Sequence, residues 1–558
     1  MHYLLLLIFL PLCTYILYGK YNIVFYITSI IYPLSVIYLL LLTQENIIVE
    51  YYDNLLVNIS KENRLISLAF MMITLATNLY AISQKRKFEV LIGSTYSFFA
   101  LMGLFAGDFI SLFVALEIMM ILASILIFYG KHKNSFIAAR QYFLTHLLGS
   151  SLILIGISYI ITHSSTIQIV PLTALIEATP NIFYLLILSG CLINVAVPPF
   201  SGWMVNCYPY ASSSGIVYLI SFTSKIAIII ILKLFSGLEI LKFFGILMIL
   251  YSGIYACIED NIKRVICYLT ISQLGFMLIA IGTKSEQVSL GVTVFLFIHI
   301  CYKALFSLYA AILIDKQQIE NCSELKIGWS IKNPLLLASL ILSILLIISA
   351  PIVSSFTAKL FIISSLSQDI SYYAILFLKI ITVIAIFSMV KYKNVTGGFA
   401  PNLNILTKLS LFTMLLFTFI ISFWFEQTLK LLNLSYPVLL YKLNREEIIE
   451  QLIVILIAIL LAKIVNKIVS RHSTTSINID LFRMVENMCR SIYYKYHYHQ
   501  IPSEDHSAVG VQYNILTSID KKTLRKIKSL HNLSASLFIV MTLLIMLTIY
   551  LSSIMNFL

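Results

Sequence analysis

Apolar runs long enough to cross a bilayer recur along the whole chain, and they constrain its fold more than any other feature. A membrane helix needs about 20 mostly apolar residues, because the hydrocarbon core is about 30 Å thick. Every backbone polar group in lipid must be bonded within the protein, which helices achieve. Of the 558 residues, 60% are hydrophobic and only 11% are charged. The sequence therefore predicts an all-α polytopic membrane protein.

The hydropathy pattern predicts about 14–16 transmembrane helices. The first apolar run has no basic residues before it and no clear small-residue cleavage site, so we expect a retained membrane helix rather than a signal peptide. The predicted spans are 2–18, 23–43, 64–83, 89–106, 109–129, 139–162, 181–200, 211–236, 241–258, 265–283, 288–314, 335–365, 371–391, 409–431, 448–470 and 534–556.

Lys and Arg gather in loops that these spans place on one side of the membrane, whereas the loop 163–180 on the other side has none. Cytoplasmic loops are rich in these residues, so the N-terminus is predicted outside and the segment 471–533 inside. The net charge of +13 follows from this topology and gives no reason to expect nucleic acid as a partner. The basic loops are 84–87, 130–140, 260–264, the loop with Lys316, Lys326 and Lys332, and 391–393.

The segment 471–533 is the one long polar stretch, with nine Lys/Arg, five Asp/Glu and five His. Its basic, aromatic-rich part is expected to lie on anionic lipid or against a partner subunit. His497, His499 and His506 are better explained as solvated surface than as metal ligands, because no Cys or carboxylate stands at ligand spacing. The scattered cysteines form no CxxC, and no nucleotide or metalloprotease motif is present. We therefore expect no cofactor and no metal.

Ionisable residues inside a membrane oppose insertion, so each suggests a function. Glu117 lies within the apolar stretch SLFVALEIMMILASILIFYG (111–130), where a carboxylate opposes insertion by about 2.5–3.5 kcal/mol. His299 and Lys303 are four residues apart and share one helical face, so a proton can pass between them through water. The candidate proton-translocating residues are Glu117, Lys225, Lys263, His299, Lys303 and Lys359.

Two charged positions have an ordinary structural alternative. Lys263 stands beside Glu259, Asp260 and Arg264 at the end of a span, where a snorkelling interface cluster explains it equally well. Lys379 is close in sequence to Lys391 and can reach polar surroundings, so it is not among the candidates.

Prolines interrupt two apolar regions, with Pro198, Pro199 and Pro209 within 194–215 and Pro351 within 349–359. A broken helix frees backbone groups that protein or water must bond, which is typical where an ion path crosses a membrane. Simple helix ends explain each stretch, taken singly, about as well. Both stretches have Pro followed by apolar, Ser and aromatic residues, which makes a duplicated half-structure plausible.

Five stretches occur in an order that points to one family: FVALEIMMILASILI (113–127), VPPFSGWMVNCYPYASSSGIVYLISFTSKIAI (197–228), DNIKRVICYLTISQLGFMLIAIG (260–282), HICYKALF (299–306) and PIVSSFTAKLFI (351–362). Together they resemble the antiporter-like subunits of respiratory complex I and the large subunits of Mrp-type Na+/H+ antiporters, most of all the D-type Mrp subunit. The similarity covers roughly residues 60–430. It implies a core of 14 helices containing two inverted five-helix repeats, each with a broken helix, around a polar axis along the membrane midplane.

This resemblance implies a division of the chain and a set of partners. We expect other membrane subunits of a hetero-oligomeric antiporter or complex I-like assembly as partners, protons and in the antiporter case Na+ as the ions moved, and a bacterial inner membrane rather than a mitochondrial one. The predicted parts are N-terminal membrane helices (1–60), the antiporter-like proton-translocating core (61–430), an additional membrane helix region (431–470), the basic interfacial segment (471–533) and a C-terminal membrane helix (534–558).

The resemblance also implies roles for single residues. Glu117 matches the glutamate that pairs with a lysine and gates proton loading, and Lys225 matches a lysine further along the following helix. Lys263 matches the lysine of the D-I-K-R helix. His299 and Lys303 match the pair on the central axis. Lys359 matches the terminal residue from which protons are expelled.

One departure from the family pattern affects the function. The family usually has a lysine nine residues before the tryptophan that is Trp203 here, and this chain has Asn194 at that place. The usual partner of the gating glutamate is therefore missing. Either Lys225 takes over as the ion partner of Glu117, or the channel is altered.

Three functions follow from the resemblance. The leading prediction is a D-type subunit of a multi-subunit cation/proton antiporter, which is not an enzyme by itself. The alternatives are a redox-free, proton-pumping membrane subunit of NADH:quinone oxidoreductase and a transport-inactive structural homologue. A membrane enzyme for lipid-linked substrates lacks the clustered loop carboxylates it needs, and an independent solute carrier leaves the ordered lysines unexplained.

Overall fold

The computed structural model describes residues 22–42, 46–51, 54–130, 132–164, 167–173, 176, 181–283, 285–326, 328–364, 366, 370–389, 402–431 and 444–468. The predicted spans 2–18 and 534–556, the segment 471–533 and the basic loop 391–393 lie outside these residues.

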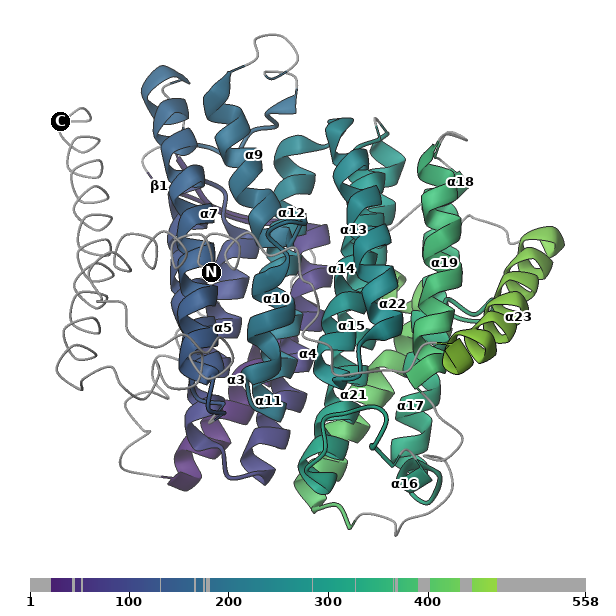
Figure 1. Cartoon of the computed structure of the whole chain (residues 1–558). Helices are drawn as coiled ribbons and strands as arrows, with labels where there is room; N and C mark the ends of the chain where they lie inside the picture. The colour runs from purple at the N-terminus through teal and green to yellow at the C-terminus, as the bar shows by residue number, and fades with distance from the viewer. Residues whose placement is uncertain are drawn as a thin grey trace, which may run out of the picture. The chain divides into compact units, whose positions relative to one another are not determined.

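The described part is almost entirely helical, as predicted, and twelve of its helices are long and apolar enough to cross a membrane. Figure 1 shows most of them packed side by side as a bundle. Eleven of the twelve are α3 (Asn22–Leu42), α4 (Lys61–Ser83), α5 (Lys87–Phe105), α6 (Phe109–Phe128), α7 (Ser135–Ser164), α13 (Ile240–Ile258), α14 (Ile262–Ile281), α15 (Glu286–Gln317), α19 (Ile370–Met389), α21 (Ile405–Phe423) and α23 (Arg445–Ile468). The twelfth is Ser213–Phe235, which α11 (Ser213–Ser221) and α12 (Thr223–Phe235) form together.

Shorter helices complete the bundle where a span is interrupted or ends. These are α9 (Ile182–Val195), α10 (Gly202–Cys207), the 3-10 turn η1 (Tyr208–Tyr210), α11 (Ser213–Ser221), α12 (Thr223–Phe235), α16 (Gly328–Ile331), α17 (Pro334–Ile347), α18 (Ser354–Ser364) and α22 (Phe425–Leu431).

Polar residues just before the helices fix where several of them begin. Asp108 accepts from the Ser111 backbone N–H at 2.7 Å before α6, and Asn261 accepts from Arg264 N–H at 3.2 Å before α14. Such caps bond backbone donors that have no partner within the helix. A short hairpin, β1 (Ile47–Tyr51) and β2 (Asn54–Ile59), follows α3. It was not predicted from the sequence.

The first broken helix confirms the interruption predicted around Pro198 and Pro199. After α9, Ala196 has the left-handed φ of 68°, and its N–H donates to Ile193 O while Val197 N–H donates to Leu192 O. These two bonds form a Schellman motif, which satisfies carbonyls at a helix end. The chain then turns through residues 196–201 and restarts as α10.

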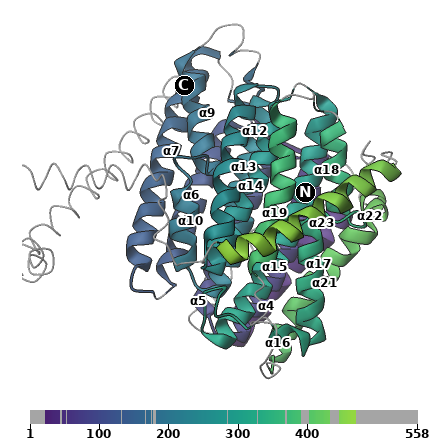
Figure 2. The same ribbon diagram turned by 45° about the vertical axis from the view of Figure 1, so that its right-hand side comes forward.

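The second broken helix repeats this geometry. Ser349 follows α17 with φ 52°, its N–H donates to Leu346 O, and Ala350 N–H donates to Leu345 O. The helix restarts as α18 at Ser354. Figures 1 and 2 show the chain running from α9 to α10 in one direction and from α17 to α18 in the other. Two matched breaks of opposite direction are the arrangement expected of an inverted repeat.

Close backbone contact joins α13 to α14, which pack between the two breaks. A Cβ atom on Gly275 would stand 2.7 Å from Gly245 O, and one on Gly245 would stand 2.5 Å from Gly275 O. Small residues allow membrane helices to approach this closely. The pair therefore fixes α14, which carries residues of the polar axis, tightly against α13.

The basic loops that the structure describes meet on one face of the bundle. A single cavity is lined by residues from the loops near Lys85, His132, Tyr210, Lys263 and Gln318. These loops belong to the set predicted to be cytoplasmic or stand directly beside it. Their common face is confirmed, and its assignment to the cytoplasm stays a prediction.

The helix α23 lies differently from the bundle helices. Figures 1 and 2 show it steeply inclined across the outer side of α19. Lys379 of α19 forms an ion pair with Glu450 of α23 at 3.7 Å, and Gln451 Nε2 donates to Ile348 O and Ser349 O at 3.2 and 3.1 Å. This helix therefore bonds the carbonyls that the second break leaves free.

Candidate functional site

Glu117 lines a small cavity between α6, α7, α9 and α12, together with His146, Ser150, Asn194 and Thr223. The cavity measures about 10 Å³, close to the space that one water molecule needs. His146 Nδ1 lies 2.8 Å from Asn194 Oδ1. Glu117 Oε1 and His146 Nε2 are buried and have no hydrogen-bond partner among the described residues. Two titratable side chains thus share one cavity, each with an unbonded atom.

Aromatic rings fix the position of His146. Its imidazole packs against the rings of Tyr142 at 4.2 Å and Trp203 at 4.5 Å between centroids. Tyr142 Oη lies 3.3 Å from Thr223 Oγ1, which also bonds Tyr96. The imidazole is therefore held in one orientation, and hydroxyl groups continue from it toward α12.

Lys225 is fully buried just after the junction of α11 and α12. Its Nζ donates to Ile220 O and, at 3.1 Å, to Ser224 Oγ. No ion pair joins Lys225 to Glu117 in the part of the chain that the structure describes. The ion pair that Lys225 was considered to form with Glu117 is therefore not present between these two residues.

The middle of α15 carries a row of buried polar groups on one face, at residues 299, 303 and 307. His299 Nδ1 lies 2.9 Å from Tyr302 Oη, while His299 Nε2, Lys303 Nζ and Ser307 Oγ have no partner among the described residues. The amide of Gln273 on α14 is equally buried and unbonded. The charges of Lys225, Lys303 and Lys359 all interact with His299. His299 and Lys303 therefore lie on one buried face of α15, and a proton axis through them stays a prediction.

Lys359 lies midway along α18, the half-helix that follows the second break. Its Nζ lies over the rings of Phe276 at 5.9 Å and Phe295 at 5.4 Å, where the aromatic faces attract a cation. Lys379 lies beyond it, beside a cavity of about 110 Å³ that Glu447 and Glu450 also line. The predicted axis would therefore end close to carboxylates of α23.

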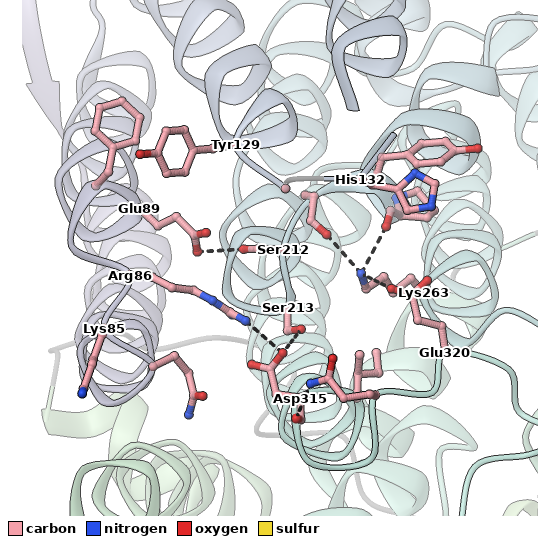
Figure 3. A pocket seen from close by; sticks show the side chains of 18 of the residues that line it. Lys85, Arg86, Glu89, Tyr129, His132, Ser212, Ser213, Lys263, Asp315 and Glu320 are labelled. Atoms are coloured by element: carbon pink, nitrogen blue, oxygen red, sulfur yellow. Dashed lines mark hydrogen bonds and ion pairs between the residues drawn. The ribbon is translucent and has the colours of Figure 1, made fainter. Parts of the chain in front are cut away.

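Lys263 bonds the segment that follows the first broken helix and not the polar row on α15. Its Nζ donates to Pro209 O at 3.2 Å and to Ala211 O at 3.0 Å, and pairs with Glu320 at 2.8 Å (Figure 3). Of the six candidates, it is the one that forms an ion pair with another described residue. Both the functional and the snorkelling interpretation of Lys263 agree with this position.

A charged cluster that was not predicted from the sequence lies beside Lys263, in a cavity of about 700 Å³. Arg86 Nη2 pairs with Asp315 Oδ1 at 2.9 Å, and Ser213 Oγ donates to the same oxygen at 2.6 Å (Figure 3). Ser212 Oγ donates to the buried Glu89 at 2.7 Å. Burial lowers the pKa of Arg86, but the carboxylates of Asp315 and Glu89 raise it further, so the net pKa lies above its usual value.

The structure thus gathers Lys225, His299, Lys303 and Lys359 in one electrostatically connected group. Glu117 lies in the small cavity with His146, and Lys263 bonds the region after the first break. His146 was missed, although Tyr142, His146 and Ser150 recur every four residues along a predicted span, the same signal that singled out His299 and Lys303. Glu89 also stands inside a predicted span and was overlooked.

Among the described residues, no group of three or more His, Cys, Asp or Glu is placed to hold a metal ion. The six described cysteines are buried, and no disulfide joins them within the described residues. His497, His499 and His506, for which a solvated surface was predicted, lie outside the described residues.

Comparison with known proteins gives a family match. The profile described as NADH:quinone oxidoreductase/Mrp antiporter, TM matches residues 106–387. NADH-quinone oxidoreductase subunit N of Francisella tularensis subsp. holarctica is 25% identical over 312 residues, which cover 51% of this chain and 63% of that protein. The chain thus spans less than two thirds of the length of this relative.

Two solved structures have a similar fold. A chain of the membrane-bound sulfane sulfur reductase, an archaeal respiratory membrane complex, gives a TM-score of 0.68 at 18% identity, covering 82% of this chain and 99% of that one. A chain of the Mrp complex from Dietzia sp. DQ12-45-1b gives 0.57 at 19% identity, covering 73% and 79%. At these identities the likeness is one of fold.

Proposed function

Because this chain belongs to the NADH:quinone oxidoreductase/Mrp antiporter transmembrane family, we propose that it is a proton-translocating subunit of a multi-subunit membrane complex. The protons move along a buried axis from Glu117 and Lys225 through His299 and Lys303 to Lys359. The energy comes from partner subunits, because the expected chemistry of this chain is limited to holding and passing protons.

The observation that carries the proposal is the row of buried polar atoms between the two broken helices. His299 Nε2, Lys303 Nζ, Ser307 Oγ and the Gln273 amide have no partner among the described residues. A buried polar group without a partner costs about 1–3 kcal/mol, so a chain selected for stability alone would not collect four of them. Such groups are normally bridged by buried water, and a row of water and amines conducts protons.

Each side chain supplies a proton site of a different kind. A carboxyl such as Glu117 can release a proton to a base, and the amine of a lysine such as Lys303 can accept one. Because Lys225 and Lys359 carry the same kind of charge as Lys303 and interact with it, protonation of one amine disfavours protonation of the others. A proton entering at one end therefore promotes release at the other.

For the energy source, we propose an electron-transfer complex of the NADH-quinone oxidoreductase type. This choice rests on the name of the curated relative. Cation/proton exchange in an Mrp-type complex is the second candidate, since the Mrp complex has a similar fold. A transport-inactive homologue is the third, because Asn194 replaces the usual lysine.

Inside-out membrane vesicles that contain the intact complex test the proposal. Proton uptake driven by NADH is followed as quenching of an acridine dye. Exchange is followed as recovery of the dye signal when Na+ is added to vesicles that another electron donor has already acidified. Glu117→Gln and Lys303→Met are each expected to abolish the dye response without loss of the complex from the membrane. The matched control is Lys316→Met, the same change at an exposed lysine of the same helix.

The outcomes separate the candidates. A response to NADH alone supports the redox-driven complex, and a response to Na+ alone supports exchange. Normal responses from both Glu117→Gln and Lys303→Met would refute proton transfer along this axis.

A further inference from the structure

We propose that His146 is the proton-exchanging partner of Glu117 and occupies the role that Lys225 and Asn194 do not fill. This inference rests on the proposed proton transfer and adds to it a residue on α7 that the family resemblance did not indicate. Three observations carry it: the shared cavity, the unbonded atoms and the orientation of the imidazole.

The shared cavity brings the two groups within reach of one water molecule. Glu117 and His146 both line it, and it measures about 10 Å³. Glu117 Oε1 and His146 Nε2 are the two titratable atoms there that are buried and unbonded within the described residues. A carboxyl and an imidazole separated by a single water can exchange a proton through it.

The bond to Asn194 determines which imidazole nitrogen is available. An amide oxygen can only accept a hydrogen bond, so Nδ1, 2.8 Å from Asn194 Oδ1, carries the hydrogen. Neutral His146 then has its lone pair on Nε2, the unbonded atom. Asn194 thus orients His146 as a base for Glu117. This role is a physical reason for an amide at position 194.

The exchange conserves charge and protons. The Oε1–H bond of protonated Glu117 breaks, a water passes the proton on, and an Nε2–H bond forms, which leaves a carboxylate and an imidazolium. The reverse step restores two neutral groups. Release from Nε2 toward α12 instead can follow the hydroxyls of Tyr142 and Thr223, which lie 3.3 Å apart and end two residues before Lys225.

Few other groups compete for this role. From the elements packed against α7, α6 presents Glu117 and η1 presents Tyr208, whose ring stacks near that of Tyr142. The contacts from α9 and α10 are Asn194 and Trp203, which do not titrate. Lys225, the alternative partner, has its ammonium bonded to Ile220 O and Ser224 Oγ. His146 is therefore the base best placed for Glu117.

The test uses the intact complex in inside-out vesicles and compares substitutions that separate shape from proton chemistry. His146→Gln keeps a side chain that can bond Asn194 but cannot titrate, and it is expected to lower proton uptake about a hundredfold, the lower end of typical acid–base contributions. His146→Leu is expected to act likewise. His163→Leu is the matched control, because His163 is an exposed histidine of the same helix.

A double variant tests whether a new base can restore proton uptake. His146→Leu with Asn194→Lys puts an amine into the same cavity from α9, and proton uptake is expected to recover to at least about a tenth of the unaltered level, because a second titrating base again faces Glu117. The amount of assembled complex in the membrane is measured for every variant on native gels.

Each result decides the matter. Loss in His146→Gln with normal assembly, together with recovery in the double variant, supports the inference. Normal uptake by His146→Gln overturns it, and if Glu117→Gln and Lys303→Met still abolish uptake, the proposed function stands without it. No recovery in an assembled double variant also overturns it. Absence of proton uptake in the unaltered complex overturns both proposals.

Discussion

Replacing Lys303 with methionine is expected to stabilise the protein while abolishing proton transfer. Lys303 is 1% exposed, and its Nζ has no partner among the described residues. Methionine has a similar length and no polar atom that needs a hydrogen bond. The substitution therefore removes the Lys303 amine, which the fold does not need but which the proposed proton path requires.

The magnitude follows from what each lysine bonds. An unpartnered buried polar group costs about 1–3 kcal/mol, so Lys303→Met is expected to raise the free energy of unfolding by about that amount. Lys225→Met removes an equally buried ammonium that donates to Ile220 O and Ser224 Oγ. Bonds from a charged donor contribute about 1.5–3 kcal/mol, so their loss cancels or reverses the gain.

Thermal unfolding of the detergent-solubilised complex measures this difference. A change of 1 kcal/mol shifts Tm by about 2–4 °C in domains of 150–250 residues, so Lys303→Met is expected to raise Tm by on the order of 2 °C, and Lys225→Met to leave it unchanged or lower it. Both variants are expected to lose proton uptake. Lys316→Met, at an exposed site, controls for loss of charge alone.

A lower Tm for Lys303→Met than for the unaltered protein would refute this reasoning, because it would mean that the Lys303 ammonium holds the fold together. Equal Tm values for Lys303→Met and Lys225→Met would show that the bonds of Lys225 contribute no net stability.

Three further substitutions test other parts of the structure. Arg86→Leu leaves Asp315, 2.9 Å away, without its ion partner. We expect a loss of about 3 kcal/mol, the low end for a broken buried pair because both side chains are partly exposed, seen as a lower Tm of the complex. Gln451→Leu frees the carbonyls of the second break, and hydrogen exchange is expected to quicken there by about tenfold, for two lost bonds of about 0.5–1.5 kcal/mol each; unchanged exchange would show that α23 does not hold the break. Gly275→Leu places a Cβ 2.7 Å from Gly245 O, and we expect the amount of assembled complex to fall sharply, whereas full assembly would mean that α13 and α14 can separate without harm.

Much of the fold could be predicted because a membrane span depends on the hydropathy of one continuous stretch of sequence. Runs of apolar residues predicted the long helices, and Pro198, Pro199 and Pro351 predicted both interruptions. The matched Schellman turns at Ala196 and Ser349 could not be predicted, since neither residue usually adopts a left-handed φ. The hairpin after α3 was missed because hydropathy gives no signal for so short a pair of strands.

The candidate site was predicted only in part, for a different reason. A lone charge in an apolar run is visible in the sequence, so Glu117, Lys303 and Lys359 were found. His146 and Glu89 lie in spans where other polar residues made them less conspicuous. The partners of each group depend on helix rotation and on helices distant in sequence, which no local pattern contains.

The sequence by itself determined that this chain is a polytopic membrane protein with ionisable groups in its spans, because apolar runs long enough to cross the bilayer are a property of local composition. Only the tertiary structure decided which of these groups can act together. In the tertiary structure, Lys225 donates a hydrogen bond to the backbone of α11, and Lys263 bonds the region after the first break and pairs with Glu320. His146 and Glu117 line the same cavity. The physical reason is that proton exchange requires contact within a few ångströms, and in a helical bundle such contacts are made between segments far apart in the chain.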